Sequence, residues 1–138
     1  AAQQIRKFFD ETKNFISNSN LPQEDKVDLF NSLYGYLKVD QGNTAQVSEF
    51  ADRFMQPNMA DNYQRHMRQR DVPSTAIAKD LSEIQSSLRL RRLRFPGAIT
   101  LSGPPNSIRD LVTVESVSEH DGERWTQVII RGQIEEQS

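Results

Sequence analysis

Apolar residues keep a helical spacing in the first part of this chain and a strand spacing in the rest. Up to about residue 87 they recur every three or four positions, which is the period of an amphipathic helix. Beyond that point they alternate with polar residues, as in a strand with one buried face. Helices followed by strands predict an α+β fold. We therefore expect a single α+β domain over residues 1–138, mainly helical over 1–87 and mainly strands over 88–134.

The amino-terminal part predicts a bundle of four or five helices. The first helix is expected over residues 3–17, and the second begins near Pro22, which suits a first helical turn. Thr44 is expected to cap a third helix that carries Val47 and Phe50 on its inner side.

A fourth helix is expected to begin near Pro57, and Asp80 can cap a short fifth helix through "LSEIQSS". The inner stripe of the fourth helix contains Met59, Tyr63 and Met67. Its outer positions contain Arg65, Arg68 and Arg70.

The stretch "SSLRLRRLRFPG", residues 86–97, concentrates arginine between leucines. Its alternation slips by one position at Arg91–Arg92, and a β-bulge there would restore a strand with one apolar face. In this interpretation Leu88, Leu90, Leu93 and Phe95 face inward, and Arg89, Arg91, Arg92 and Arg94 face outward. The alternative is a helix that continues through Leu81, Ile84, Leu88 and Phe95.

The remaining segments predict a small, mainly antiparallel sheet of three or four strands. "AITLSG" is expected to be a strand, and "PPNSIRDL" a turn that can include one helical turn. "VTVESVS" and "RWTQVII" are expected to form a hairpin with Asp121–Gly122 in its turn. Trp125 is expected in the core, with a place at an interface as the alternative.

Charge is unevenly distributed along the chain, although the net charge is only −2. Residues 61–109 hold nine basic and four acidic residues, a balance of +5, whereas residues 110–138 hold two and seven, a balance of −5. This distribution predicts one basic zone on a dipolar protein.

No constellation in the sequence favours catalysis, a metal or a cofactor. The chain has no cysteine, and its two histidines, His66 and His120, have no second ligand nearby in sequence except the acids of "EHDGE". That motif falls at an expected hairpin tip, where solvated charges are common. No glycine-rich phosphate loop and no nucleophile elbow is present. We therefore expect a non-enzymatic protein without cofactors.

The arginines are the remaining candidates for function. Arg89, Arg91, Arg92 and Arg94, helped by Arg65, Arg68 and Arg70, could follow a phosphate backbone, because guanidinium groups bind phosphates through paired hydrogen bonds. Nothing signals base readout. Two alternatives stay open: the arginines could pair with the acidic carboxyl segment, within the chain or across a dimer, or could serve solubility alone.

Several segments resemble the carboxyl-terminal half of the bacterial thirty-seven-kilodalton nucleoid-associated protein family. They are "FFDETKNFI", "LPQEDKVDLFNSLYGYLK", "VSEFADRFM", "RFPGAITLSGPPNSIRDLVTVESV" and "WTQVIIRGQI". The resemblance implies a bacterial, cytoplasmic, nucleoid-bound protein with ties to double-stranded DNA and to topoisomerase. It does not extend to the basic character of residues 88–97, where the family is richer in glycine.

Together these observations predict a DNA-binding or chromosome-organising protein that contacts the DNA backbone. The alternative is a dimerisation or docking module, a homo-oligomer that binds itself or a DNA-processing enzyme. No apolar run is long enough for a membrane span. Because an initiator methionine is absent, we expect the chain to be a fragment of a longer protein.

Overall fold

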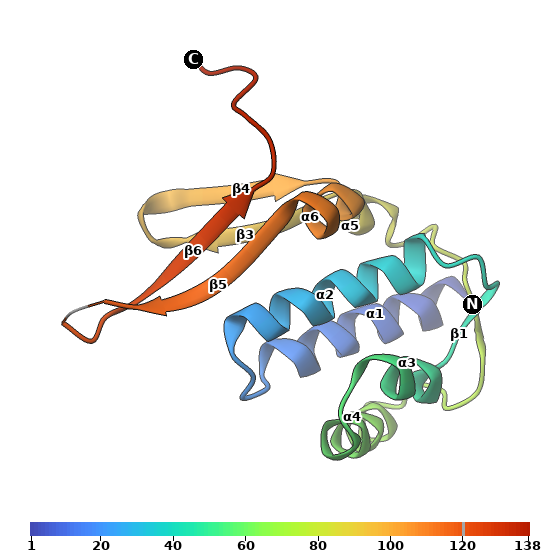
Figure 1. Ribbon diagram of the computed structural model, residues 1–138. Helices are drawn as coiled ribbons and strands as arrows, with labels where there is room; N and C mark the ends of the chain where they lie inside the picture. The colour runs from blue at the N-terminus through green and yellow to red at the C-terminus, as the bar shows by residue number, and fades with distance from the viewer. Residues whose placement is uncertain (120) are drawn as a thin grey trace.

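The computed structural model describes residues 1–119 and 121–138 and confirms the α+β class. The helices lie together in one body, and two hairpins lie against it beside the second helix (Figure 1). Within the described residues, no helix has both the length and the apolar character needed to cross a membrane. The elements are α1 (Ala2–Ser17), α2 (Gln23–Lys38), β1 (Thr44–Ala45), α3 (Val47–Phe54), α4 (Pro57–Gln69), β2 (Ile77–Ala78), α5 (Gln85–Arg89), β3 (Arg91–Phe95), a 3-10 turn (Pro96–Ala98), β4 (Ile99–Gly103), α6 (Pro105–Leu111), β5 (Val112–Ser118) and β6 (Arg124–Ile130).

Aromatic side chains of the first four helices form the centre of the core. Phe8 of α1 and Phe50 of α3 are fully buried, with ring centroids 6.2 Å apart and nearly perpendicular planes. Tyr63 of α4 packs on Phe50 at 5.9 Å. These residues belong to the apolar stripes predicted from the sequence, so the burial of the stripes explains why the four helices pack together.

A buried pair of hydroxyl groups joins α1 to α4. Thr12 Oγ1 and Tyr63 Oη lie 2.7 Å apart, and both residues are completely buried. Burial raises the pKa of Tyr63. Each hydroxyl satisfies the other, so neither polar group is left unpaired in the core.

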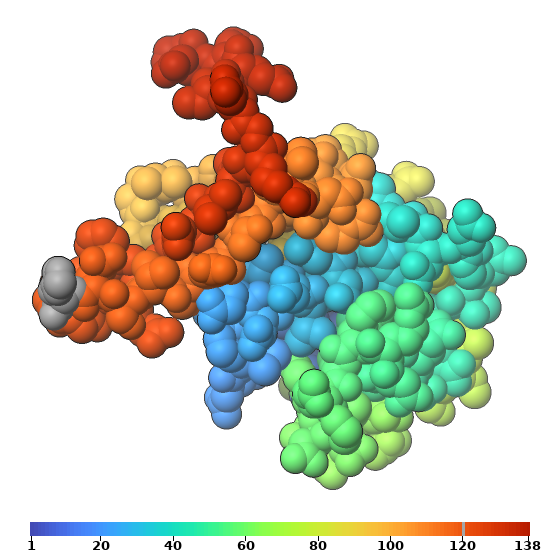
Figure 2. All heavy atoms as spheres, viewed as in Figure 1, coloured from blue at the N-terminus to red at the C-terminus, as the bar shows by residue number. Residues whose placement is uncertain are grey.

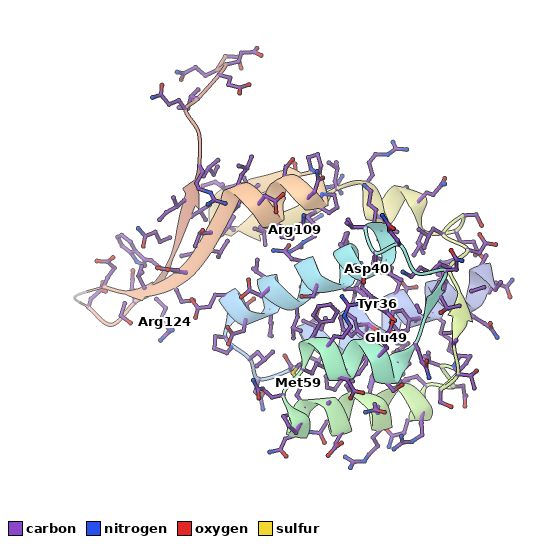
Figure 3. The ribbon with its side chains drawn as sticks, turned by 45° about the vertical axis from the view of Figure 1, so that its right-hand side comes forward. Tyr36, Asp40, Glu49, Met59, Arg109 and Arg124 are labelled. Atoms are coloured by element: carbon purple, nitrogen blue, oxygen red, sulfur yellow. The ribbon has the colours of Figure 1, made fainter. Side chains whose placement is uncertain are left out.

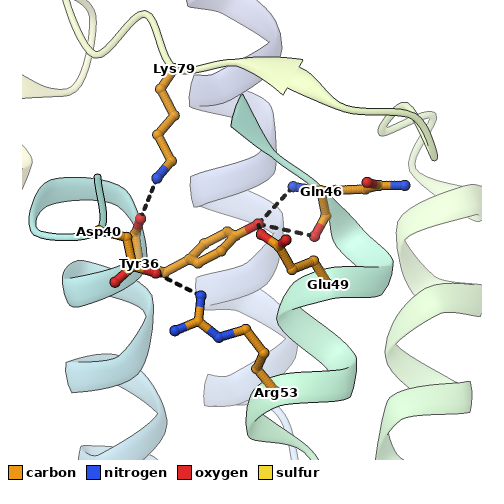
Figure 4. A network of polar contacts seen from close by, with 6 residues as sticks. All are labelled: Tyr36, Asp40, Gln46, Glu49, Arg53 and Lys79. Atoms are coloured by element: carbon orange, nitrogen blue, oxygen red, sulfur yellow. Dashed lines mark hydrogen bonds and ion pairs between the residues drawn. The ribbon is translucent and has the colours of Figure 1, made fainter. Parts of the chain in front are cut away.

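Tyr36 organises a second polar network, between α2 and α3 (Figure 4). Its hydroxyl donates to Glu49 Oε1 at 2.6 Å and accepts from the backbone N–H of Gln46 at 2.9 Å. Lys79 Nζ donates to the backbone carbonyl of Tyr36 at 2.7 Å. Burial and the Glu49 carboxylate raise the pKa of Tyr36. The network fixes the end of α2 against the start of α3.

The predictions for the two caps need correction. Thr44 does not cap α3, because it lies in the short strand β1, where it pairs with Ala78, and Gln46 precedes the helix instead. Asp80 does accept the N–H and the hydroxyl of Ser82, but these bonds close a turn, and α5 begins only at Gln85.

The strands form three separate antiparallel pairs rather than one sheet: β1–β2, β3–β4 and β5–β6. The predicted β5–β6 hairpin is present, and Gly122 in its turn has a φ of +81°, a conformation that favours glycine. Trp125, expected in the core, is 55% exposed, so that prediction is wrong. The reason is that the tip of the β5–β6 hairpin projects beyond the helices (Figure 2), so most side chains of β6 are exposed.

Candidate nucleic-acid interface

The basic stretch 86–97 contains both a helix and a strand, so each of the two sequence interpretations was partly right. α5 continues to Arg89, and β3 then pairs with β4 in a regular register from Arg91 opposite Gly103 to Phe95 opposite Ile99. The change from helix to strand at Leu90 absorbs the slip in the apolar pattern, and the predicted bulge at Arg91–Arg92 is absent.

This register places Arg91 on the inner face of the hairpin, contrary to the prediction that all four arginines point outward. Arg91 is 5% exposed, whereas Arg89, Arg92 and Arg94 are exposed. Leu90, expected to be buried, is 37% exposed. Strand alternation from Arg91 gives the reason, since Arg91, Leu93 and Phe95 then share one face.

Arg91 fastens β3 to α2. Its Nε donates to Asn31 Oδ1 at 3.0 Å and its Nη2 to the carbonyl of Val27 at 3.4 Å. The guanidinium lies over the rings of Phe30 and Tyr34, at 5.4 and 5.5 Å from their centroids. Burial lowers the pKa of Arg91. In the described part of the chain no carboxylate pairs with it, so helix carbonyls and aromatic rings compensate its charge.

Above Arg91 a groove of about 700 Å³ runs between the amino-terminal helices and the segment 86–94. Every charged residue that lines it is basic: Lys13, Lys26, Arg89, Arg91, Arg92 and Arg94. The lining also contains the apolar residues Val27, Phe30, Leu90 and Leu93 and the polar residues Gln23, Tyr34, Ser86 and Ser87. We call this feature the basic groove.

The exposed arginines of the basic groove have no acidic partner within the described residues. Arg89, Arg92 and Arg94 occur in none of the ion pairs that the structure contains. Pairing inside one chain with the acidic carboxyl segment, one of the alternatives drawn from the sequence, is therefore not observed. Their charge stays available to an external anion.

The other three predicted site residues lie elsewhere. Arg65, Arg68 and Arg70 are exposed on or next to α4, which Figure 1 shows on the opposite side of α1 and α2 from β3. Arg70 Nε lies 4.0 Å from Glu11 Oε1, and Arg65 donates to Asn62 at 3.0 Å. The structure therefore separates the seven predicted arginines into two groups, and only 89–94 shares a groove.

Sequence reasoning missed two residues of the basic groove, Lys13 and Lys26. Both lie on helices distant in sequence from β3, and Lys26 also donates to the carbonyl of Ser17 at 2.9 Å. Only the packing of α1 and α2 against the hairpin brings them to the arginines. No spacing in the sequence carries that information.

A second groove, of about 880 Å³, lies on the other side of α2 and is lined by Glu24, Asp28, Asp40 and Glu115 together with Arg53 and Arg109. Figure 3 shows Arg109 on α6 and Asp40 and Tyr36 at the far end of α2. Burial, followed by the neighbouring Asp25 and Glu24, raises the pKa of Asp28. Arg53 pairs with Asp40 at 2.6 Å and Arg109 with Asp110 at 2.9 Å. We call it the acidic groove.

The histidines offer no metal centre in the described residues. His66 lies 3.2 Å from Glu11 Oε1 and 5.5 Å from the ring of Phe15. His120 and the "EHDGE" motif it belongs to fall partly outside the described residues. Across residues 1–119 and 121–138, no three metal-binding side chains are grouped.

Comparisons of the chain with protein-family models, with curated proteins and with solved structures find no match. The resemblance to the nucleoid-associated family therefore stays a prediction.

Proposed function

We propose that this protein is a non-enzymatic, nucleoid-associated DNA-binding protein of the bacterial cytoplasm that holds the phosphate backbone of double-stranded DNA in the basic groove. The observation that carries the proposal is the convergence of six basic side chains, with no acidic one, on a single groove. Like charges brought this close repel one another, and a polyanion relieves that repulsion while releasing its own counterions.

The groove also favours backbone contact over base contact. The guanidinium of Arg91 lies over the ring of Phe30, which is partly buried, and Tyr34 is buried, so little aromatic surface is left for a base to stack on. Arginine and lysine supply phosphate contacts without sequence information. Binding should therefore depend strongly on salt and little on DNA sequence.

The test is the salt dependence of binding to a random duplex, measured by fluorescence anisotropy. Replacing Arg92 and Arg94 by glutamine should reduce the slope of log affinity against log salt by about 0.9 for each lost contact, about two in all. Replacing Arg65 and Arg68 instead should leave the slope unchanged, since these residues lie outside the groove. Absence of binding at low salt, or equal losses in the two variants, would contradict the proposal.

A second candidate function is docking on another protein, such as a topoisomerase or a second copy. Exposed apolar side chains on the hairpins favour it: Ile99 is 65% exposed and Trp125 55%. Here an Arg92/Arg94 variant would keep its partner, and DNA would not compete with that partner.

A further inference from the structure

Only one of the two edges of the β5–β6 hairpin makes hydrogen bonds to the rest of the described structure. The edge of β5 lies against α2, where Glu24 Oε2 accepts the N–H of Ser116 at 2.6 Å. Among the described residues, no backbone hydrogen bond reaches β6 from anything except β5. β6 is therefore a seven-residue strand with one edge that lacks a backbone hydrogen-bond partner among the described residues.

The hydrogen-bond register shows which backbone groups face that free edge. Glu119 N–H donates to the carbonyl of Glu123 at one end, and Arg131 N–H donates to that of Leu111 at the other. Hydrogen-bonded and non-hydrogen-bonded residue pairs alternate along an antiparallel ladder. Both of these bonds join odd-numbered residues, so the odd-numbered residues of β6 bond to β5. The N–H and C=O groups of Arg124, Thr126, Val128 and Ile130 consequently point outward.

The side chains of β6 do little to prevent pairing with another strand. Natural edge strands are usually protected by charge, proline or a bulge. Between Arg124 and Arg131 the sequence is "WTQVII", with no charge and no proline, and its ladder with β5 is regular. Ile129 and Ile130 are about half exposed, like Trp125.

We propose that β6 pairs antiparallel with β6 of a second copy, with the two-fold axis at Gln127. Only even-numbered residues can exchange hydrogen bonds across this edge, and with this axis Thr126 pairs with Val128 and Arg124 with Ile130. A shift of one strand by one residue would require the N–H and C=O groups of odd-numbered residues at the interface. Those groups already bond to β5, so this shift is excluded.

Within residues 123–131, charge complementarity favours this register among those that the backbone allows. With the axis at Gln127, Glu123 of one copy lies opposite Arg131 of the other, on the face that also carries Trp125 opposite Ile129. The acidic and basic ends of the strand are thus matched twice by symmetry. An isologous pairing of this kind closes as a dimer and leaves no further free β6 edge.

The absence of cysteine allows a direct test of the axis. Opposed residues in a non-hydrogen-bonded antiparallel pair have Cα atoms about 4.5 Å apart, within the range of about 4.4–6.8 Å that a disulfide spans. Gln127→Cys should therefore form a covalent dimer in oxidised glutathione. Thr126→Cys and Val128→Cys are matched controls and should crosslink far more slowly. Faster crosslinking at 126 or 128, or none at any position, would overturn the proposed axis.

A charge exchange tests the register without cysteine. Glu123→Arg should place two arginines together and weaken the dimer by about tenfold over its two symmetric contacts, and adding Arg131→Glu should restore it. Sedimentation velocity of the whole chain measures both. Failure of the double variant to recover, or a monomeric parent at every concentration, would refute self-pairing.

A third variant separates the backbone contact from folding. Thr126→Pro removes an outward N–H that β5 does not use, so the hairpin should persist by circular dichroism while dimerisation is lost. The DNA-binding proposal is independent, since Arg92 and Arg94 are outside β6. If the parent protein binds DNA with the expected salt slope but forms no dimer, the self-pairing proposal fails. If it forms the dimer but does not bind DNA, the DNA-binding proposal fails.

Discussion

Replacing Arg91 tests whether this residue holds the hairpin to the helices or instead contacts a ligand. The change Arg91→Ala removes a nearly buried guanidinium with two hydrogen bonds to α2 and two stacked rings. We expect it to lower the free energy of unfolding, because the carbonyl of Val27 and the amide oxygen of Asn31 lose their donor.

The magnitude follows from these contacts. Two hydrogen bonds from a charged donor contribute about 3 kcal/mol together. The cation–π contacts contribute about 1 kcal/mol. The cost of desolvating the guanidinium offsets about half of this sum, since replacing a buried charge by apolar atoms recovers solvation energy. A net loss of about 2 kcal/mol is therefore expected.

The assay is urea denaturation followed by far-ultraviolet circular dichroism, with hydrogen exchange of the β3–β4 amides. Arg92→Ala, one position away and exposed, is the matched control and should change stability by no more than about 0.5 kcal/mol. Arg91→Met keeps the aliphatic packing and should fall between the two. Equal stabilities of the Arg91 and Arg92 alanine variants would refute the structural role of Arg91.

Three further predictions follow from the polar contacts. Tyr63→Phe leaves the buried hydroxyl of Thr12 unpaired and should cost about 1–2 kcal/mol by urea denaturation, and adding Thr12→Val should recover part of this loss. The pKa of Asp28 is higher in the folded than in the unfolded chain, so the free energy of unfolding should fall as the pH rises through the folded pKa. Asp28→Asn should therefore raise the melting temperature at neutral pH. This difference between the variant and the parent should vanish in acid below the unfolded pKa. A lower melting temperature for Asp28→Asn at neutral pH would contradict this sign. Glu24→Ala removes the acceptor of the Ser116 N–H, so that amide should exchange faster in hydrogen-exchange NMR while the β5–β6 ladder amides stay protected.

The helices could be predicted from the sequence because each buries one continuous stripe. The segments around Phe8, Leu33, Phe50 and Tyr63 were located by spacing alone, and all four residues are fully buried. Local spacing is sufficient there, since a helix that covers one core needs one apolar face. Thr44 failed as a cap because pairing with β2 drew it into a strand, a long-range contact that capping preferences do not describe.

The hairpins were harder to predict because they bury few apolar side chains. Trp125 was expected in the core, but it is 55% exposed, because the tip of its hairpin projects beyond the helices (Figure 2). The prediction for Arg91 was wrong in the opposite sense, because this charged residue was expected to be exposed and is buried. Its burial depends on carbonyl and aromatic partners from α2, which lie about sixty positions earlier in the chain.

The arrangement of side chains on α2 explains why only one side of the molecule suits a polyanion. Along this helix Lys26, Phe30 and Tyr34 follow one another at intervals of four, as do Glu24, Asp28 and Ser32 on a neighbouring stripe. The first stripe lines the basic groove and the second the acidic groove, so one helix separates two surfaces of opposite sign. The acids of the second groove repel a phosphate backbone, and this repulsion acts across roughly a Debye length, about 10 Å at moderate salt. In the proposed complex, a duplex that approaches the protein would be guided to the arginines by repulsion on one side of α2 as well as by attraction on the other. The net charge of −2 is then compatible with the proposed DNA binding, because the distribution of charge, and not its total, determines the field that a duplex would meet.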